Sequence, residues 1–341
     1  MQALRVERPG LASLVEVEVP RPGAGEVLVR VGAAGICGSD LELLEGRRPA
    51  PYVRYPIVPG HEWAGTVAAV GAGVEGVSTG DPVVAEGFRA CEICIRCREG
   101  LTNLCLAEYA ETGFTHQGAF AEYLCVPAGL VHRLPPGSDL EAAALLEPAA
   151  CVACGLLEAD LRPGLAVAVV GSGTLGLLAV SLLRLTSPSR LALVGTRPDR
   201  LELGRRLGAG EICDVRAEDP IPRIGGMFDL VFEAASRPEG ADTALRLARR
   251  GGTVVLEGIS GAARPTIDPD VVTLGHLRVQ GVFGASRAAW SWVVQLFSSG
   301  ALDPRPLVTH RYPLEGYEAA FAALQNPAAA ALKVELLPSS G

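Results

Sequence analysis

Four cysteines crowded into one short segment restrict this chain more than any other feature. They lie at Cys91, Cys94, Cys97 and Cys105, with two residues between each of the first three thiols and seven before the fourth. A loop with this spacing can wrap one ion in tetrahedral geometry, and a closed four-thiolate site is typical of structural zinc. The alternative is a set of reduced or disulfide-paired cysteines. The segment therefore predicts a structural zinc site.

Length, charge and hydropathy narrow the class of protein. A chain of 341 residues, 49% of them apolar, has material for two domains of ordinary size. Its formal net charge of −8 disfavours a nucleic-acid-binding protein, which needs a basic face. No apolar run reaches the roughly 18 residues of a membrane span, and the N-terminus lacks the apolar core of a signal peptide. We expect a cytoplasmic protein without nucleic-acid or membrane partners.

The sequence pattern changes near residue 148. Before it, short β segments broken by glycine and proline predict a barrel-like β domain. After it, apolar strands alternate with helices, which predicts a parallel sheet covered on both faces. The strands are expected at residues 165–170, 190–194, 229–233 and 252–257, and the helices at 175–185, 200–207 and 241–250. A helix at 288–298 and a strand at 331–336 are expected to return to the first domain. The predicted domains are residues 1–147 with 285–341, and residues 148–284.

A glycine-rich loop follows the first apolar strand of the second domain. Its residues are Gly171, Ser172, Gly173, Thr174, Leu175 and Gly176. Glycines with this spacing permit a tight turn, a close approach of the backbone to a pyrophosphate, and tight packing of the helix on the strand. The helix N-terminus adds donors for the anion. Because the loop stands between an apolar strand and a helix, it predicts a dinucleotide-binding site.

The end of the next strand bears on the choice between NAD(H) and NADP(H). An acidic residue there would accept a hydrogen bond from the 2′-hydroxyl of the NAD ribose. This chain instead has Gly195, Thr196, Arg197 and Arg200. The glycine leaves room for a 2′-phosphate, which the threonine and the arginines can bind. The alternative is that both arginines are solvated at the start of a helix. We predict NADP(H) as the preferred cofactor, with NAD(H) as the alternative.

A second candidate metal site combines three separated segments. They contribute Cys37, His61 with Glu62, and Glu147. A cysteine, a histidine and a carboxylate that leave one position to water or substrate are typical of catalytic zinc. Each residue also has an ordinary interpretation, as a small buried cysteine, a core histidine or an acid at a helix start. Spacing alone does not decide between these interpretations.

The order of motifs along the chain resembles the zinc-dependent medium-chain dehydrogenase/reductase family, which includes alcohol, sorbitol and threonine dehydrogenases. Besides the four cysteines and the glycine-rich loop, the resemblance rests on Gly35-Ile-Cys37-Gly-Ser39-Asp40, Pro59-Gly-His61-Glu62, Gly118-Ala-Phe-Ala-Glu-Tyr123 and Leu146-Glu147-Pro148. It covers essentially the whole chain. It implies an α/β protein with a GroES-like β-rich catalytic domain and a Rossmann-type domain built on a doubly wound parallel sheet. It also implies an enzyme that transfers a hydride between NAD(P) and a secondary alcohol or ketone of a polyol, sugar, cyclitol or amino alcohol.

The resemblance assigns roles to individual residues. Cys37, His61 and Glu147 would hold the catalytic zinc, and Glu62 would approach the metal or its water. Asp40 would orient His61, as metal-bound histidines generally require. Ser39 would pass the substrate proton toward solvent. Two zinc ions per chain are therefore expected, one catalytic and one structural.

Departures from the family pattern bear on the substrate. Glu42 stands where many alcohol and threonine dehydrogenases have a histidine in the proton relay. The run at residues 281–285 lacks the arginine and tyrosine of polyol dehydrogenases, whereas Glu147 groups the chain with polyol, sugar, threonine and aminocyclitol dehydrogenases. A zinc-free quinone or enoyl reductase and a non-catalytic dinucleotide-binding protein are the alternatives. In the family, the apolar strand at 275–283 pairs across a two-fold axis, so a homodimer or homotetramer is expected.

Overall fold

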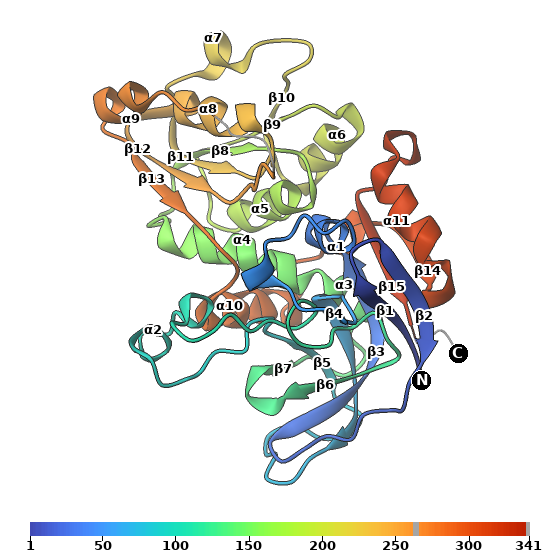
Figure 1. The fold of residues 1–341 in the computed structure, drawn as a ribbon. Helices are drawn as coiled ribbons and strands as arrows, with labels where there is room; N and C mark the ends of the chain where they lie inside the picture. Colours follow the sequence, from blue (N-terminus) through green and yellow to red (C-terminus); the bar gives the residue numbers. More distant parts are fainter. Residues whose placement is uncertain (262–265, 339–341) are drawn as a thin grey trace. The chain divides into compact units, whose positions relative to one another are not determined.

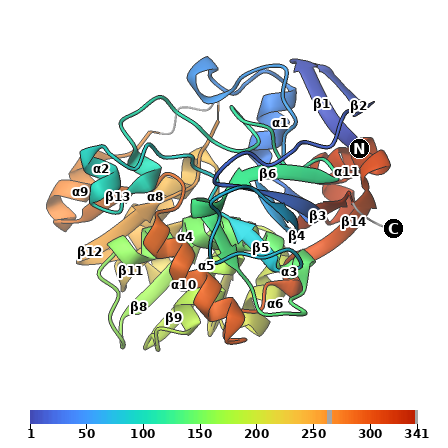
Figure 2. The same cartoon turned by 90° about the horizontal axis from the view of Figure 1, so that it is seen from below.

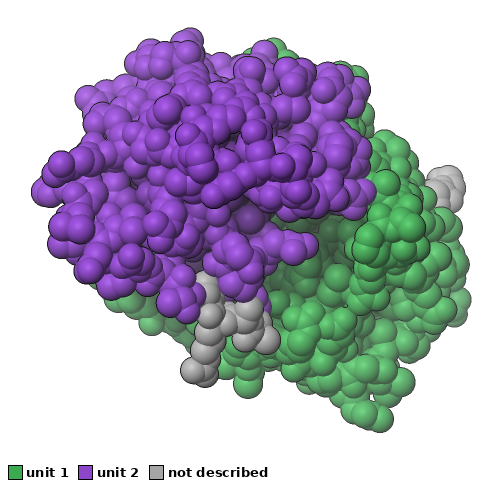
Figure 3. Space-filling model, turned by 90° about the horizontal axis from the view of Figure 1, so that it is seen from above, with its two compact units in different colours: residues 1–147, 286–341 green, residues 148–285 purple. Residues whose placement is uncertain are grey.

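The computed structural model describes residues 1–261 and 266–338. The chain divides into two compact units, coloured separately in Figure 3. Unit 1 contains residues 1–147 and 286–341, and unit 2 contains residues 148–285. Among the helices of the described residues, none combines the length and the apolarity that a membrane crossing requires. The assignment of catalysis to the first domain and of dinucleotide binding to the second is a prediction from the sequence.

Unit 1 is built on β-strands that come from both ends of the chain. The main sheet has the order β14-β15-β3-β4-β5-β7, with β6 paired to β3, while β1 and β2 form a separate pair. The strands are β1 (Gln2–Arg8), β2 (Leu11–Glu16), β3 (Glu26–Ile36), β4 (Glu62–Val70), β5 (Pro82–Ala85), β6 (Tyr123–Pro127), β7 (Val131–Arg133), β14 (Val308–Pro313) and β15 (Lys333–Leu337). The C-terminal strand β15 therefore lies directly beside β3, as the sequence predicts for the returning segment.

The helices of unit 1 are mostly short. They are α1 (Gly38–Leu44), α2 (Ile95–Arg98), α3 (Leu140–Ala144), α10 (Arg287–Ser298) and α11 (Tyr317–Gln325). Helix α3 packs on β3 and β4. Gly32 permits this contact, because a Cβ there would lie 2.5 Å from the Leu140 side chain. The sheet core includes the buried side chains of Val29, Trp63 and Phe120.

Unit 2 contains a six-stranded, wholly parallel sheet of order β10-β9-β8-β11-β12-β13. Its strands are β8 (Ala166–Val170), β9 (Arg190–Gly195), β10 (Glu211–Asp214), β11 (Phe228–Glu233), β12 (Ala248–Leu256) and β13 (Arg278–Gly281). Its helices are α4 (Leu146–Glu158, which begins in unit 1), α5 (Thr174–Arg184), α6 (Pro198–Leu207), α7 (Pro220–Ile224), α8 (Pro238–Leu247) and α9 (Pro269–Gly275). Figures 1 and 2 show β8, β9, β11 and β12 side by side. The sequence predicts β8, β9, β11 and β12 with α5, α6 and α8, as a βαβ domain requires. It does not predict β10, α7 or α9, and its apolar strand at 275–283 is longer than β13.

One predicted helix has the wrong limits. The sequence predicts a helix over 241–250, but α8 spans Pro238–Leu247 and β12 begins at Ala248. Pro238 starts the helix early because its fixed φ and missing N–H suit the first turn. Ala248 then pairs with Phe228 on β11. Apolar spacing alone cannot reveal this pairing, because it depends on a strand twenty residues earlier in the chain.

Candidate functional site

Cys37 stands at the junction of β3 and α1. Its backbone N–H donates a hydrogen bond of 2.9 Å to Oδ2 of Asp40, in the first turn of α1. The hydroxyl of Ser39 donates to Sγ of Cys37 over 3.2 Å. Both contacts are local, so they follow from the sequence Cys-Gly-Ser-Asp at a helix start.

His61 lies immediately before β4 and is held against Asp40. Nδ1 of His61 is 3.4 Å from Oδ1 of Asp40, and both side chains are buried. Neither atom has a hydrogen-bond partner among the described residues. Burial lowers the pKa of His61, but Asp40 and Cys37 beside it raise the pKa well above the ordinary value. With Nδ1 turned to the carboxylate, Nε2 is left available to a metal ion.

Three of the four sequence-predicted metal ligands meet in unit 1. Ligand atoms of Cys37, His61 and Glu62 all lie within 4.8 Å of one another. Glu147, at the start of α4, is not in this group, but burial raises its pKa to about 7 in the combined field of His61, which lowers it, and Glu62, which raises it. A thiolate, an imidazole and carboxylates are the donors that zinc takes in proteins, so these residues fit the expected ion.

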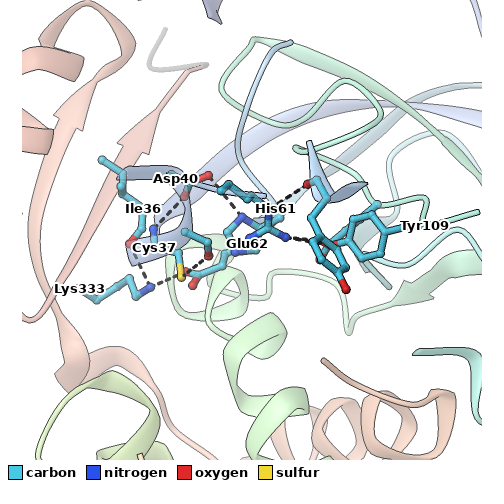
Figure 4. A network of polar contacts seen from close by, with 11 residues as sticks. Ile36, Cys37, Asp40, His61, Glu62, Tyr109 and Lys333 are labelled. Atoms are coloured by element: carbon cyan, nitrogen blue, oxygen red, sulfur yellow. Dashed lines mark hydrogen bonds and ion pairs between the residues drawn. The ribbon is translucent and has the colours of Figure 1, made fainter. Parts of the chain in front are cut away.

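Lys333 is a member of this group that the motifs do not predict. It begins β15 and is buried. Its ammonium donates to the carbonyl of Ile36 over 3.3 Å and pairs with Oε2 of Glu62. Figure 4 shows Lys333 pointing toward Ile36 and Glu62, with Asp40 turned to His61. One sequence signal was available, since Lys333 is the only lysine of the chain and lies in an apolar strand.

A second polar group that the motifs do not predict lies near His61. Arg48 donates a hydrogen bond of 2.9 Å to the hydroxyl of Tyr109, and its guanidinium lies 3.4 Å from the Glu111 carboxylate. The Tyr109 hydroxyl in turn donates a hydrogen bond to Glu111. The Arg48 guanidinium stands over the ring of Phe114, 3.6 Å from its centroid, and that ring contacts His61. Burial raises the pKa of Glu111 to about 7, although His61 and Arg48 lower it. These residues place donors and acceptors close to the candidate metal ligands.

The four-cysteine segment has the shape of a closed metal site. Its four sulfur atoms lie within 4.8 Å of one another, and the Cys94 Sγ is 3.4 Å from that of Cys97 and 4.0 Å from that of Cys105. A tetrahedral ion with zinc–sulfur bonds of about 2.3 Å requires sulfur–sulfur distances of roughly 3.8 Å. Backbone N–H groups of Leu106 and Cys97 lower the pKa of Cys94 to about 6, which favours the thiolate. The segment fits zinc.

Each glycine of the dinucleotide loop has a different surrounding. Gly171 has a φ of +113°, and a Cβ there would lie 2.7 Å from the backbone of Ala234. A Cβ at Gly176 would lie 1.9 Å from the carbonyl oxygen of Gly171. Gly173, which precedes α5, has no atom within 4 Å of the position of a Cβ. There is thus no room for a side chain at Gly171 or Gly176, whereas the backbone at Gly173 is accessible. A loop that binds a pyrophosphate through its backbone requires this arrangement.

The end of β9 carries the residues predicted to select the cofactor. Arg197 and Asp199 form an exposed pair, with Nε of the arginine 3.2 Å from Oδ1 of the acid. Arg200 is partly buried, and burial lowers its pKa. A Cβ on Gly195 would lie 2.5 Å from Oγ of Ser172. The structure thus brings Ser172, Gly195 and the arginines together, and it adds Asp199 as a competitor for Arg197.

Comparison with known proteins gives matches over both units. The alcohol dehydrogenase GroES-like domain model matches residues 23–136, and the zinc-binding dehydrogenase model matches residues 174–299. The chain is 35% identical to L-threonine 3-dehydrogenase of Bacillus velezensis over 320 residues, which is 91% of each protein. It is 31% identical to D-arabinitol dehydrogenase 1 of Uromyces fabae over 329 residues, covering 94% of this chain and 93% of the relative.

A solved structure agrees over the whole length. A zinc-binding dehydrogenase from Sinorhizobium meliloti 1021, bound to NADP, is 32% identical and has a TM-score of 0.91, covering 99% of each chain.

Proposed function

This chain belongs to the family of zinc-binding dehydrogenases with an alcohol dehydrogenase GroES-like domain. On this basis we propose which of its residues bind zinc, which transfer the substrate proton and which bind the dinucleotide. The predicted fold class, GroES-like plus Rossmann-type, is confirmed. So is the predicted activity: the protein is an NAD(P)-dependent oxidoreductase of the alcohol dehydrogenase type, with relatives that are threonine and polyol dehydrogenases.

Unit 1 is proposed as the catalytic domain. Cys37, His61 and Glu147 would hold a catalytic zinc ion, with Glu62 within reach of it. The ligand atoms of Cys37, His61 and Glu62 lie within 4.8 Å of one another, and the buried Glu147 lies in the electrostatic field of His61 and Glu62. When bound, the ion would act as a Lewis acid on the substrate oxygen, and the nicotinamide would accept the hydride. Asp40 faces Nδ1 of His61, so Nε2 would be the ring nitrogen that binds the ion.

Ser39 is proposed to move the substrate proton. Its hydroxyl is 3.2 Å from Sγ of Cys37, so it directly contacts a proposed ligand of the metal ion. A hydroxyl both accepts and donates a proton, and can pass it outward without holding a charge. The half-buried Glu42, which lies on the same helix α1 and 3.4 Å from Arg47, is the proposed outer end of the path.

The four cysteines are proposed to hold a second, structural zinc ion. Their spacing leaves no open coordination position, since four thiolates complete a tetrahedron. The cofactor content would then be two zinc ions per chain and one dinucleotide. Thiolate sites require reduced cysteines, which is our reason for proposing a cytoplasmic location.

Unit 2 is proposed to bind the dinucleotide, with NADP(H) preferred over NAD(H). The pyrophosphate would lie on the backbone of residues 171–176, and the 2′-phosphate on Thr196, Arg197 and Arg200 beside Gly195. The absence of an acid from the end of β9 supports this preference. Exposed apolar side chains on and beside β13, among them Val279 and Leu274, support a homodimer or homotetramer.

The observation that carries the proposal is the meeting of Cys37, His61 and Glu62 within 4.8 Å. Its test is zinc content and turnover in Cys37→Ala and His61→Ala, with a screen of threonine, polyols, sugars and aminocyclitols as substrates. We expect about one zinc ion fewer per chain, loss of turnover, and nearly unchanged NADP(H) binding. Cys151→Ala, on α4, is the matched control and should keep both ions. Full turnover in Cys37→Ala would contradict the proposal.

A further inference from the structure

Four neighbouring strands of unit 1 place one row of residues on the same face of the sheet. Arg311 on β14 is in register with Glu335 on β15, Glu335 with Gly35 on β3, and Gly35 with Glu62 on β4. Residues in register on adjacent strands project to the same side of a sheet. Lys333 lies two residues before Glu335 on β15 and therefore shares this face.

Gly35 is the one residue of this row that has no side chain. A Cβ on Gly35 would lie 2.4 Å from Oε2 of Glu62, so only a glycine leaves room for that carboxylate to lean across β3. The Lys333 ammonium reaches into the same space and pairs with Glu62 and with the carbonyl of Ile36. Two carboxylates, Glu62 and Glu335, thus flank one glycine, with one lysine beside them.

Glu335 is buried without a hydrogen-bond partner. Its side chain is fully buried, and neither carboxyl oxygen has a partner among the described residues. A buried polar group without a hydrogen-bond partner destabilises the folded state, so such groups are rare in native folds. Two cations lie beside it on the sheet: Arg311 is its partner in register on β14, and Lys333 lies two residues earlier on β15. Arg311 is partly exposed and paired with Glu141, whereas Lys333 is buried and on the same strand.

We propose that Lys333 is a positioning residue with two carboxylate partners, and that its movement from Glu62 to Glu335 releases Glu62 to approach the catalytic metal ion. A flexible four-carbon stem allows this exchange. Successive residues on one face of a strand are about 6.6 Å apart, which the lysine side chain spans. The inference rests on the proposed metal site, because Glu62 has a ligand role only there.

The test is a double-mutant cycle on metal affinity. Cobalt(II) is titrated into enzyme whose catalytic ion has been removed, with chelator competition and visible absorption as readouts. Glu335→Gln should weaken cobalt binding on the order of tenfold, the value of one charged contact, because the lysine then stays on Glu62. Lys333→Met should not weaken binding, and Glu335→Gln should have no further effect in the Lys333→Met background.

Two further variants make the result decisive. Arg311→Gln is the matched control, and it should leave the cobalt affinity unchanged. If Arg311→Gln weakens cobalt binding as much as Glu335→Gln does, then the partner of Glu335 is Arg311 and the proposal is overturned. Glu335→Val replaces the first variant if Glu335→Gln does not fold. An unchanged affinity in the Glu335 variant, or an equal loss in the Lys333→Met background, would also overturn the exchange. A cobalt affinity that is insensitive to Cys37→Ala would instead overturn the proposed metal site itself.

Discussion

Oγ of Ser172 lies 2.5 Å from the position that a Cβ on Gly195 would occupy, and Cβ of Ser172 lies 2.8 Å from it. The dinucleotide loop and the end of β9 are therefore not independent. Any side chain placed at position 195, the end of β9 where an NAD-binding acid is expected, would therefore meet this serine. If the chain binds NADP(H) as proposed, this pair of residues would contribute to cofactor choice together with the arginines that follow.

Replacing Arg197 with alanine should remove most of the preference for NADP(H). The guanidinium would make a charge-assisted bond to the 2′-phosphate, worth about 1.5–3 kcal/mol. The measurement is kcat/KM with NADP(H) and with NAD(H). Asp199→Ala is the companion variant. Arg197 donates hydrogen bonds to the Asp199 carboxylate, so removing this carboxylate should free the guanidinium for the 2′-phosphate and increase the preference for NADP(H). If Arg197→Ala leaves the ratio unchanged, the arginine faces solvent in the complex as well.

An aspartate at Gly195 should shift the preference to NAD(H) only when Ser172 is changed with it. Gly195→Asp alone should lower the melting temperature, because its Cβ overlaps Ser172. Even an alanine at 172 would keep the 2.8 Å contact, so the partner change is Ser172→Gly. The double variant should recover stability and repel the 2′-phosphate. Equal stability of Gly195→Asp and wild type would show that the serine moves aside without cost.

Loss of the structural ion should destabilise its segment without touching the catalytic residues. Cys97→Ser removes one of four ligands, and a loop with few large apolar side chains then has little else to fix its shape. We expect a lower melting temperature and about one zinc ion fewer per chain, with activity reduced only indirectly. Cys125→Ser, outside the segment, should keep both ions. An unchanged melting temperature in Cys97→Ser would rule out the structural role.

The parts of the site that the sequence predicts are those made by local or motif-level constraints. Cys37, Ser39 and Asp40 lie within one helix start, and the glycines of residues 171–176 lie within one turn, so their geometry follows from their spacing. The apolar strands of unit 2 are likewise readable, since burial on both faces requires continuous apolar runs. The limits of α8 are the exception, because strand pairing overrides the helical pattern there.

The parts that the sequence does not predict depend on strand register. Lys333 meets Glu62 because β15 pairs with β3 and β3 with β4, a relation between residues about 270 positions apart. The contact between Ser172 and Gly195 also depends on how β8 and β9 pair. No periodicity in a single segment contains this information.

Stability should fall as the pH rises from about 5 to 8, and Glu335 should be one cause. In the arrangement of this structure, with Lys333 paired to Glu62, burial raises the pKa of Glu335 to about 8, although Lys333 and Arg311 lower it. The unfolded chain has a glutamate pKa of about 4.3, so between these values the folded state binds more protons, and stability is lost with rising pH at up to about 1.4 kcal/mol per unit. Urea unfolding at several pH values should show a shallower decline in Glu335→Gln. The exposed Glu315→Gln should keep the wild-type slope, and an identical slope in the Glu335 variant would contradict the assignment.

Asp40→Asn should weaken the catalytic metal site more than it weakens the fold. Asp40 fixes both ligand-bearing segments, because Oδ2 accepts from the backbone of Cys37 while Oδ1 faces Nδ1 of His61. An asparagine keeps the shape and one acceptor but loses the charge that holds the imidazole in its ligating orientation. Loss of the hydrogen-bond partner of a metal-bound histidine typically lowers metal affinity by roughly 10–100-fold. We expect a loss of that size in chelator competition, with zinc retained at the four cysteines.

Glu42→Gln, on the same helix but outside this contact, is the control and should keep the metal affinity of the wild type. If Asp40→Asn binds zinc as tightly as wild type, then His61 is oriented by its packing on Phe114 rather than by the carboxylate.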